Sequence, residues 1–218
     1  MGLSLRLDLY VVTDASLSRG LGHVESARRA LAGGADVIQL RDKELSALDL
    51  FRLAEEMAGL AHERGALFIV NDRLDIALAS GADGVHLGQD DLPVREARRL
   101  SPPGFVIGAS VGSVEEARRA ERDGADYVAL SPLFSTPSKA DAGPGLGLEE
   151  LDRMSSAVKV PVIAIGGIHR GNAADAIEHG AVGVAVISAV IGQPDVEGAA
   201  RDLRSVVEAA LSRCGRCR

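Results

Sequence analysis

Three cations follow short apolar runs of the chain. Arg41 closes the run 37–41, Lys43 follows two residues later, and Lys139 lies in a polar segment after the run 127–130. The chain has three lysines in all, so two of them occupy such positions, while arginine is its usual cation. Cations gathered in one place suit a phosphate-rich ligand. These side chains therefore predict an anion site, provided that the fold brings them together.

Two carboxylates occupy comparable positions. Asp72 follows the run 67–71, and Asp91 lies shortly after the run 84–87. A Mg2+ ion takes one or two protein carboxylates and fills its other positions with water and phosphate oxygens. Gly166-Gly167 and Ile187-Ser188 end two later runs, where backbone N–H groups can bind a phosphate. The residue types thus predict a phosphate and Mg2+ site.

Each of these residues also has a purely structural interpretation. Arg41 and Lys43 could be surface charges beside adjacent acids, and Asn71-Asp72 could cap a following helix. Ser110 could begin the next helix, and His86 lies in an apolar run, where an interior histidine is the ordinary case. The functional interpretation is favoured because so many polar residues follow consecutive apolar runs.

The apolar runs themselves predict the fold. They are short, rich in β-branched residues and nearly continuous, as in parallel strands that are covered on both faces. Segments with helical periodicity separate them, and eight strands that alternate with helices form a closed barrel. The fold class is therefore α/β, a single (β/α)8 TIM barrel, with its active site at the C-terminal ends of the strands. The predicted strands are Leu7–Val12, Val37–Arg41, Leu67–Asn71, Gly84–Leu87, Val106–Ala109, Tyr127–Leu130, Val160–Gly166 and Gly183–Ile187.

Helix signals support this division. The segment Ala47–Arg64 has an apolar face, Ser46 and Ser113 begin capping-box-like patterns, and Pro93 suits a first helical turn. A Gly-Ala-Asp or Gly-Ala-Val triplet precedes every second strand, beginning at positions 34, 81, 124 and 180. Glycine there ends a helix in a left-handed turn. We interpret these aspartates as helix-to-strand joints at the N-terminal end of the barrel.

Composition limits the possible functions. The 218 residues suit one domain, 1–218, with a short tail at 212–218, and 46% hydrophobic residues can fill its core. A net charge of −7 and 3% aromatic residues argue against nucleic-acid binding. The longest apolar run is far below the roughly 20 residues that span a bilayer. We therefore expect a soluble cytoplasmic protein, and we interpret Cys214 and Cys217 as tail thiols rather than a zinc site.

Taken together, the motifs resemble those of the thiamine phosphate synthase family from about Leu9 to Gly192. The matching segments are Gln39-Leu-Arg-x-Lys43, Asn71-Asp72, His86-Leu-Gly-Gln-x-Asp91, Ser110, Thr136-x-Ser138-Lys139, Gly166-Gly-Ile168 and Val186-Ile-Ser188. The resemblance implies a transferase of thiamine biosynthesis. It would condense a hydroxymethylpyrimidine diphosphate with a thiazole phosphate and release thiamine phosphate and pyrophosphate.

The same resemblance implies roles for individual residues. Mg2+ would be bound by Asp72 and Asp91, and catalysis would depend on Arg41, Lys43, Lys139 and Ser110. The segment residues Leu40, Asp42 and Pro137 are counted with their neighbours as substrate contacts. The pyrimidine diphosphate would be held by Gln39, Arg41, Lys43, Asn71, Ser110 and Lys139, and the thiazole phosphate by Thr136, Ser138, Gly167, Ile187 and Ser188.

Two positions depart from the family pattern. Ser138 stands where a threonine is usual, which keeps the hydroxyl, and Gly112 stands where a histidine is common. A related thiazole tautomerase, a phosphate-sugar isomerase on the same fold and a catalytically silent metabolite sensor are the alternatives. Release of pyrophosphate when both substrates are supplied with Mg2+ distinguishes the synthase from all three.

Overall fold

Eight parallel strands close into a barrel with the order β1 to β8, as the sequence predicts. The structure is a computed structural model that describes residues 5–136 and 144–215. Its strands are β1 (Leu9–Thr13), β2 (Val37–Leu40), β3 (Leu67–Asn71), β4 (Gly84–Leu87), β5 (Val106–Val111), β6 (Tyr127–Leu130), β7 (Val162–Ile165) and β8 (Gly183–Val186). Its helices are α1 (Gly22–Ala32), α2 (Ala47–His62), α3 (Leu74–Ala79), α4 (Val94–Leu100), α5 (Val114–Asp123), α6 (Leu148–Ala157), α7 (Ala173–Glu178) and α8 (Val196–Arg213).

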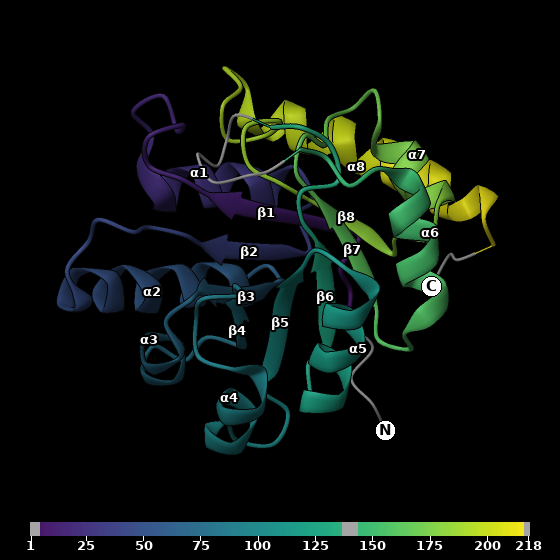
Figure 1. Cartoon of the computed structure of the whole chain (residues 1–218). Helices are drawn as coiled ribbons and strands as arrows, with labels where there is room; N and C mark the ends of the chain where they lie inside the picture. Colours follow the sequence, from purple (N-terminus) through teal and green to yellow (C-terminus); the bar gives the residue numbers. More distant parts are fainter. Residues whose placement is uncertain (1–4, 137–143, 216–218) are drawn as a thin grey trace.

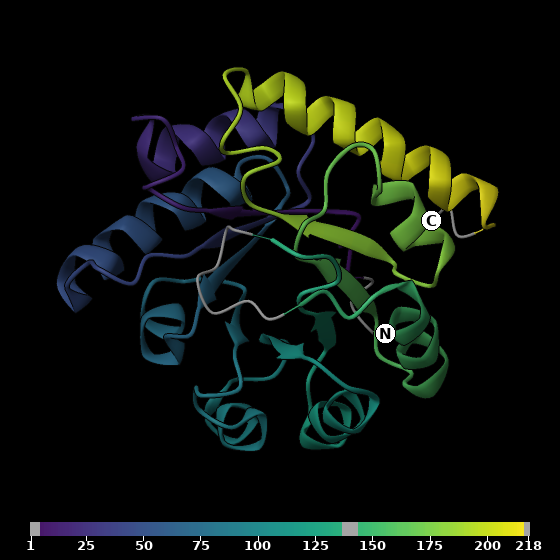
Figure 2. The same ribbon diagram turned by 45° about the horizontal axis from the view of Figure 1, so that its top comes forward.

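The helices form an outer layer around the strands (Figures 1 and 2). Successive strand side chains alternate between the barrel interior and this outer layer. In β1, Leu9 and Val11 pack outward against the helices, whereas Tyr10 and Val12 belong to a second apolar cluster inside the barrel. The same alternation decides which strand-end residues can face the centre of the barrel.

The repeated joints have the predicted geometry. Gly34, Gly81, Gly124 and Gly180 all have a positive φ, between 75° and 102°, which glycine adopts without the steric cost of a side chain. The aspartates that follow accept hydrogen bonds from strand N–H groups; Asp36, for example, accepts from Leu9 N at 3.0 Å. Asp83 and Asp126 do the same for Phe68 and Ile107, both at 2.7 Å. These carboxylates therefore serve the N-terminal end of the barrel.

Several element ends differ from the prediction. Helix α2 ends at His62, two residues earlier than expected, while Ser46 and Ser113 cap α2 and α5 as predicted. Pro93 is the residue before α4, with φ −54° and ψ 138°, and not part of its first turn. Helix α8 continues to Arg213, two residues into the predicted tail. Among the described residues, no helix has the length and apolar character needed to cross a membrane.

Candidate active site

Most of the polar residues predicted from the sequence line one cavity at the C-terminal ends of β2 to β5. The cavity has a volume of about 460 Å³. It brings together cations from the end of β2, carboxylates from the loops after β3 and β4, and a hydroxyl from β5. Its lining includes Arg41, Lys43, Asn71, Asp72, His86, Gln89, Asp91, Ser110, Gly112, Glu116, Ser131 and Pro132.

A second, smaller cavity of about 40 Å³ adjoins the first. It lies at the ends of β7 and β8 and shares Ser131 and Pro132 with the larger cavity. Its lining includes Gly166 and, within the described part of the chain, the residues expected at the thiazole phosphate. These residues are Thr136, Gly167, Ile187 and Ser188. The two groups of predicted site residues therefore lie next to each other.

The segment after β6 joins the two cavities. Leu133 N donates to Ile165 O at 2.7 Å and Phe134 N donates to Gly166 O at 3.0 Å, which ties the segment to the end of β7. A Cβ on Gly166 or Gly167 would come within 2.7 Å of atoms of this segment. Glycine is therefore required at both positions for the segment to approach β7 so closely. Pro137, Ser138 and Lys139, which the sequence analysis assigned to the site, lie outside the described residues.

Asp72 has an unusual backbone conformation. Its φ is +63°, a left-handed value that is uncommon outside glycine and is found at functional sites. Its N–H donates to His86 O at 2.8 Å. Helix α3 begins only at Leu74, after Arg73, and no side chain caps it, so the interpretation of Asn71-Asp72 as a helix cap is wrong.

The ionisation of Asp72 is also unusual. Burial, together with the neighbouring Asp91 carboxylate, raises the pKa of Asp72 to about 6, although Lys43 and Arg41 lower it. Asp91 is itself fixed, since its Oδ2 accepts a hydrogen bond from Gly88 N at 2.6 Å. A hard divalent cation would stabilise the charge of Asp72 beside this second carboxylate, so the two side chains form a suitable donor set.

This donor set fits Mg2+ bound together with a phosphate ligand. The described residues contain no group of three or more His, Cys, Asp or Glu side chains placed to hold a metal. Two carboxylates are, however, the usual protein share of a Mg2+ site whose other ligands are waters and substrate phosphates. Residues Asp72 and Asp91 would then supply the protein oxygens.

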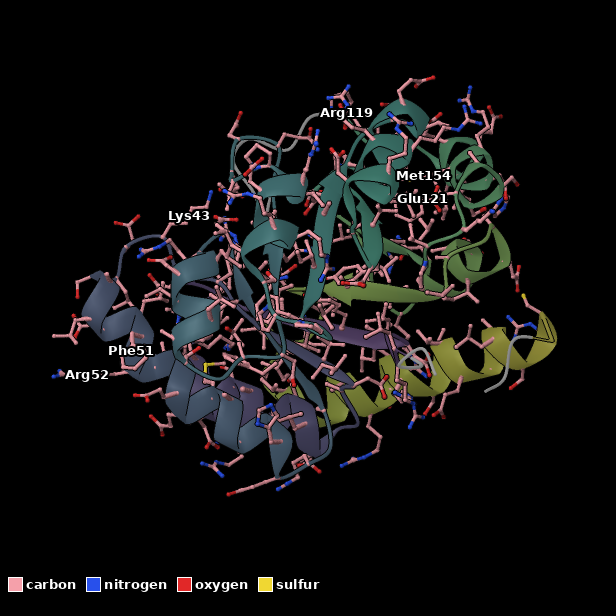
Figure 3. The ribbon with its side chains drawn as sticks, turned by 90° about the horizontal axis from the view of Figure 1, so that it is seen from below. Lys43, Phe51, Arg52, Arg119, Glu121 and Met154 are labelled. Carbon is pink, nitrogen blue, oxygen red and sulfur yellow. The ribbon has the colours of Figure 1, made fainter. Side chains whose placement is uncertain are left out.

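Arg41 is held in place by a residue that the sequence analysis did not single out. Its Nη1 lies 3.1 Å from Asp14 Oδ2, and both side chains are largely buried. Asp14 directly follows β1, so the rule that functional residues follow barrel strands could have identified it. Lys43 lies in the loop between β2 and α2, whereas Arg52 extends from α2 away from the barrel (Figure 3). The charge of Lys43 reaches the site, because it helps to lower the pKa of Asp72.

Three predicted contacts among the described residues lie outside the lining of both cavities: Gln39, Leu40 and Asp42. Leu40 is buried in the apolar layer between strands and helices, because the alternation along β2 turns Gln39 and Arg41 inward and Leu40 outward. Asp42 turns toward its own loop, where it accepts hydrogen bonds from Glu44 N and Leu45 N. It also pairs with His23 Nε2 at 3.0 Å.

A line of hydrogen bonds runs through the barrel interior beside the larger cavity. Gln39 Nε2 donates to Tyr10 OH at 2.7 Å, and the hydroxyls of Tyr10 and Tyr127 lie 3.0 Å apart. His86 Nδ1 lies 3.0 Å from Tyr127 OH, and its Nε2 lies 2.9 Å from Ser110 Oγ. His86 is thus a hydrogen-bonded interior histidine, as expected. The two tyrosines leave no signal in the sequence, because strands distant in the chain bring them together.

The chain matches known proteins over most of its length. The family described as thiamine monophosphate synthase matches residues 9–190. The thiamine-phosphate synthase of Methanoculleus marisnigri is 62% identical over 203 residues, which cover 93% of this chain and 96% of that protein. The protein of the same name from Methanocella arvoryzae is 57% identical, with 93% and 96% covered.

Solved structures agree with this result. Thiamine phosphate pyrophosphorylase from Pyrococcus furiosus has a TM-score of 0.89 and 45% identity, and the match covers 96% of this chain and 100% of that chain. A 3-hexulose-6-phosphate synthase has a TM-score of 0.72 at 18% identity and therefore shares the barrel fold alone.

Proposed function

The chain belongs to the thiamine monophosphate synthase family, and from this membership we propose how its residues perform the reaction. The reaction joins 4-amino-2-methyl-5-hydroxymethylpyrimidine diphosphate to a thiazole phosphate and yields thiamine phosphate and pyrophosphate. The observation that supports the assignment of residues is the pair of adjoining cavities. One is rich in charged side chains, and the lining of the other consists of uncharged residues.

The larger cavity binds the pyrimidine diphosphate. Arg41 and Lys43 neutralise its phosphates, and Asn71 and Ser110 supply further hydrogen bonds from the ends of β3 and β5. Gln39 belongs to the same subsite from the barrel interior, where it is 4% exposed. Lys139 joins this group on the strength of the sequence resemblance alone.

Asp72 and Asp91 would hold a Mg2+ ion in the same cavity. When bound, this ion supplies positive charge to the diphosphate oxygens as the leaving group forms. The raised pKa of Asp72 beside Asp91 supports this assignment, because a cation stabilises the ionised form of Asp72.

The smaller cavity binds the phosphate of the thiazole. Gly167, Ile187 and Ser188 follow β7 and β8, where barrels of this kind often present backbone N–H groups to a phosphate. Thr136 and Ser138 are assigned to the same phosphate. Because Ser131 and Pro132 line both cavities, a thiazole anchored by its phosphate has its ring directed toward the pyrimidine.

The chemistry then needs no protein nucleophile. The bond between the pyrimidine methylene carbon and the diphosphate oxygen breaks, and the electron pair leaves with pyrophosphate. Arg41 and Lys43 stabilise the charge that develops on this leaving group. The ring nitrogen of the thiazole then forms the new bond to the methylene carbon, and its fixed position makes this capture effectively intramolecular.

The decisive test is release of pyrophosphate. We expect release that needs both substrates and Mg2+, with thiamine phosphate formed in equal amount. A tautomerase, an isomerase or a sensor would release none. The subsite assignment is tested separately with Asn71→Ala, which is expected to weaken binding of the pyrimidine diphosphate while thiazole phosphate binds as before in calorimetry.

A further inference from the structure

Five polar side chains from five strands form a continuous hydrogen-bonded line inside the barrel. In order, this interior network consists of Gln39 on β2, Tyr10 on β1, Tyr127 on β6, His86 on β4 and Ser110 on β5. The two tyrosines are at most 1% exposed, and Gln39 and His86 are 4% and 7% exposed. Burial of this kind makes every unmade hydrogen bond costly, so each hydroxyl hydrogen needs an acceptor.

The direction of the hydrogen bonds follows from one end of the network. The Gln39 side-chain nitrogen can only donate, so Tyr10 OH accepts from it. Tyr10 must then place its own hydrogen on Tyr127 OH, because the opposite direction would leave a buried Tyr10 hydrogen without an acceptor. Tyr127 in turn directs its hydrogen to the other neighbour of its hydroxyl, His86 Nδ1.

The histidine passes this direction on. A His86 ring that accepts at Nδ1 carries its hydrogen on Nε2 when neutral, and Nε2 faces Ser110 Oγ. Ser110 accepts this hydrogen bond, so its own hydroxyl hydrogen remains for a ligand in the larger cavity, which Ser110 lines. We propose that the interior network makes Ser110 a hydrogen-bond donor to bound substrate, with His86 and Tyr127 as positioning residues.

This proposal rests on the proposed function and adds the direction of one hydrogen bond, which Ser110 donates to the substrate. Ser110 as a donor suits an oxygen of the leaving diphosphate, which gains negative charge as the bond breaks. A donor directed at the pyrimidine ring would instead oppose the positive charge that develops there. Since Nε2 of His86 already carries a hydrogen, the imidazole cannot take a proton from Ser110 and does not act as its base.

Packing around Tyr127 holds its ring in place within the network. Gly108 on β5 pairs in register with both His86 and Tyr127, and a Cβ at Gly108 would collide with the Tyr127 ring. The His86 and Tyr127 rings stack, with centroids 5.6 Å apart and an interplanar angle of 28°. Because residue 108 is a glycine, the Tyr127 ring can occupy this space and lie against the His86 ring.

The tautomer of His86 is the direct test. In nitrogen-15 labelled protein without substrates, at about pH 8, where an ordinary histidine is neutral, we expect His86 as the Nε2–H tautomer. The His86→Gln variant removes one of five histidine signals and so identifies it. Tyr10→Phe should preserve the tautomer, because Tyr127 can still donate to Nδ1, whereas Tyr127→Phe should yield a mixture. An Nδ1–H tautomer or an imidazolium in the wild-type protein would overturn the proposal, whatever the variants do.

Two substitutions at position 86 separate positioning from packing. A glutamine amide can reach the place of Nε2 and donate to Ser110, whereas the shorter asparagine amide reaches only toward Tyr127. We expect His86→Asn to lower the single-turnover rate of pyrophosphate release about tenfold, the scale of one misdirected hydrogen bond. His86→Gln should retain most of the rate, and both variants should keep the wild-type affinity for thiazole phosphate. Equal rates of pyrophosphate release in His86→Asn and His86→Gln, with both variants folded like the wild type, would contradict the positioning role.

The acceptor is tested with inorganic pyrophosphate and Mg2+. Ser110→Ala should weaken the binding of this probe about tenfold in calorimetry, and unchanged binding would refute the leaving-group contact. These readouts differ from those of the function itself. Wild-type protein that shows the expected tautomer but releases no pyrophosphate would refute the proposed function and leave the network's direction standing.

Discussion

Protons should compete with the divalent cation at Asp72. A cation needs the ionised carboxylate, and burial together with Asp91 raises the pKa of Asp72 to about 6. The affinity for the cation is therefore expected to fall as the pH decreases through 6 and to be constant above about pH 7. A carboxylate with an ordinary pKa of 3.8 would keep its affinity throughout this range.

The size of the effect follows from the raised pKa. At a pKa of about 6, Asp72 is about 97% ionised at pH 7.5 and about 9% ionised at pH 5, so the affinity should fall about tenfold. With a pKa of 3.8, the carboxylate would still be about 94% ionised at pH 5. Bound cation in turn lowers the pKa of Asp72. A pH titration of Asp72 should therefore give a lower pKa with the cation than without it.

The assay measures Mn2+ binding by electron paramagnetic resonance without substrates, with Mg2+ as competitor. Mn2+ prefers the same hard oxygen ligands, and leaving out diphosphate removes a second titrating group. Asp72→Asn should abolish the pH step. Asp90→Asn removes the same charge from the loop that carries Asp91, so it should weaken binding but retain the step. An affinity that is independent of pH in the wild type, or a step that survives in Asp72→Asn, would refute the assignment.

Four further changes test other parts of the site. Asp91→Ala should lower turnover and alter the Mg2+ dependence without unfolding the barrel, and a wild-type rate across a Mg2+ titration would contradict the metal assignment. Ser188→Asp places a carboxylate against the thiazole phosphate, so calorimetry should show a loss for that ligand and not for the diphosphate. Lys139→Ala should lower single-turnover diphosphate cleavage about 10²–10³-fold, and a rate within about threefold of wild type would refute its role. Gly108→Ala should destabilise the fold by about 1–3 kcal/mol through overpacking against Tyr127, and unchanged thermal unfolding would contradict this.

Local signals explain why so much of the fold could be predicted. The caps at Ser46 and Ser113 and the joint glycines are determined by residues close in the chain, so their patterns are visible in the sequence. The rule that active sites lie at strand ends then located most of the cavity lining. Leu40 was misplaced because neighbours along a strand point in opposite directions.

Features that depend on distant strands could not be predicted in this way. Tyr10 and Tyr127 are 117 residues apart and meet only because both point into the closed barrel. The turn at Asp72 carries no glycine that would reveal its left-handed backbone. Both features concern the residues that we expect to determine charge and hydrogen-bond direction in the site.

In the proposed function, the two cavities give each substrate a different environment. Side-chain charge is concentrated at the ends of β2 to β4, where we propose that the diphosphate leaves and its developing charge is stabilised. The ends of β7 and β8 line the smaller cavity with uncharged residues, which suit a nucleophile that must be positioned but not further polarised. Because the segment after β6 is hydrogen-bonded to Ile165 and Gly166, its Ser131 and Pro132 form a shared wall that holds the two environments at a fixed separation. Under this proposal, the barrel keeps the charges that stabilise leaving pyrophosphate apart from the site that presents the thiazole nitrogen, while the two cavities remain adjacent.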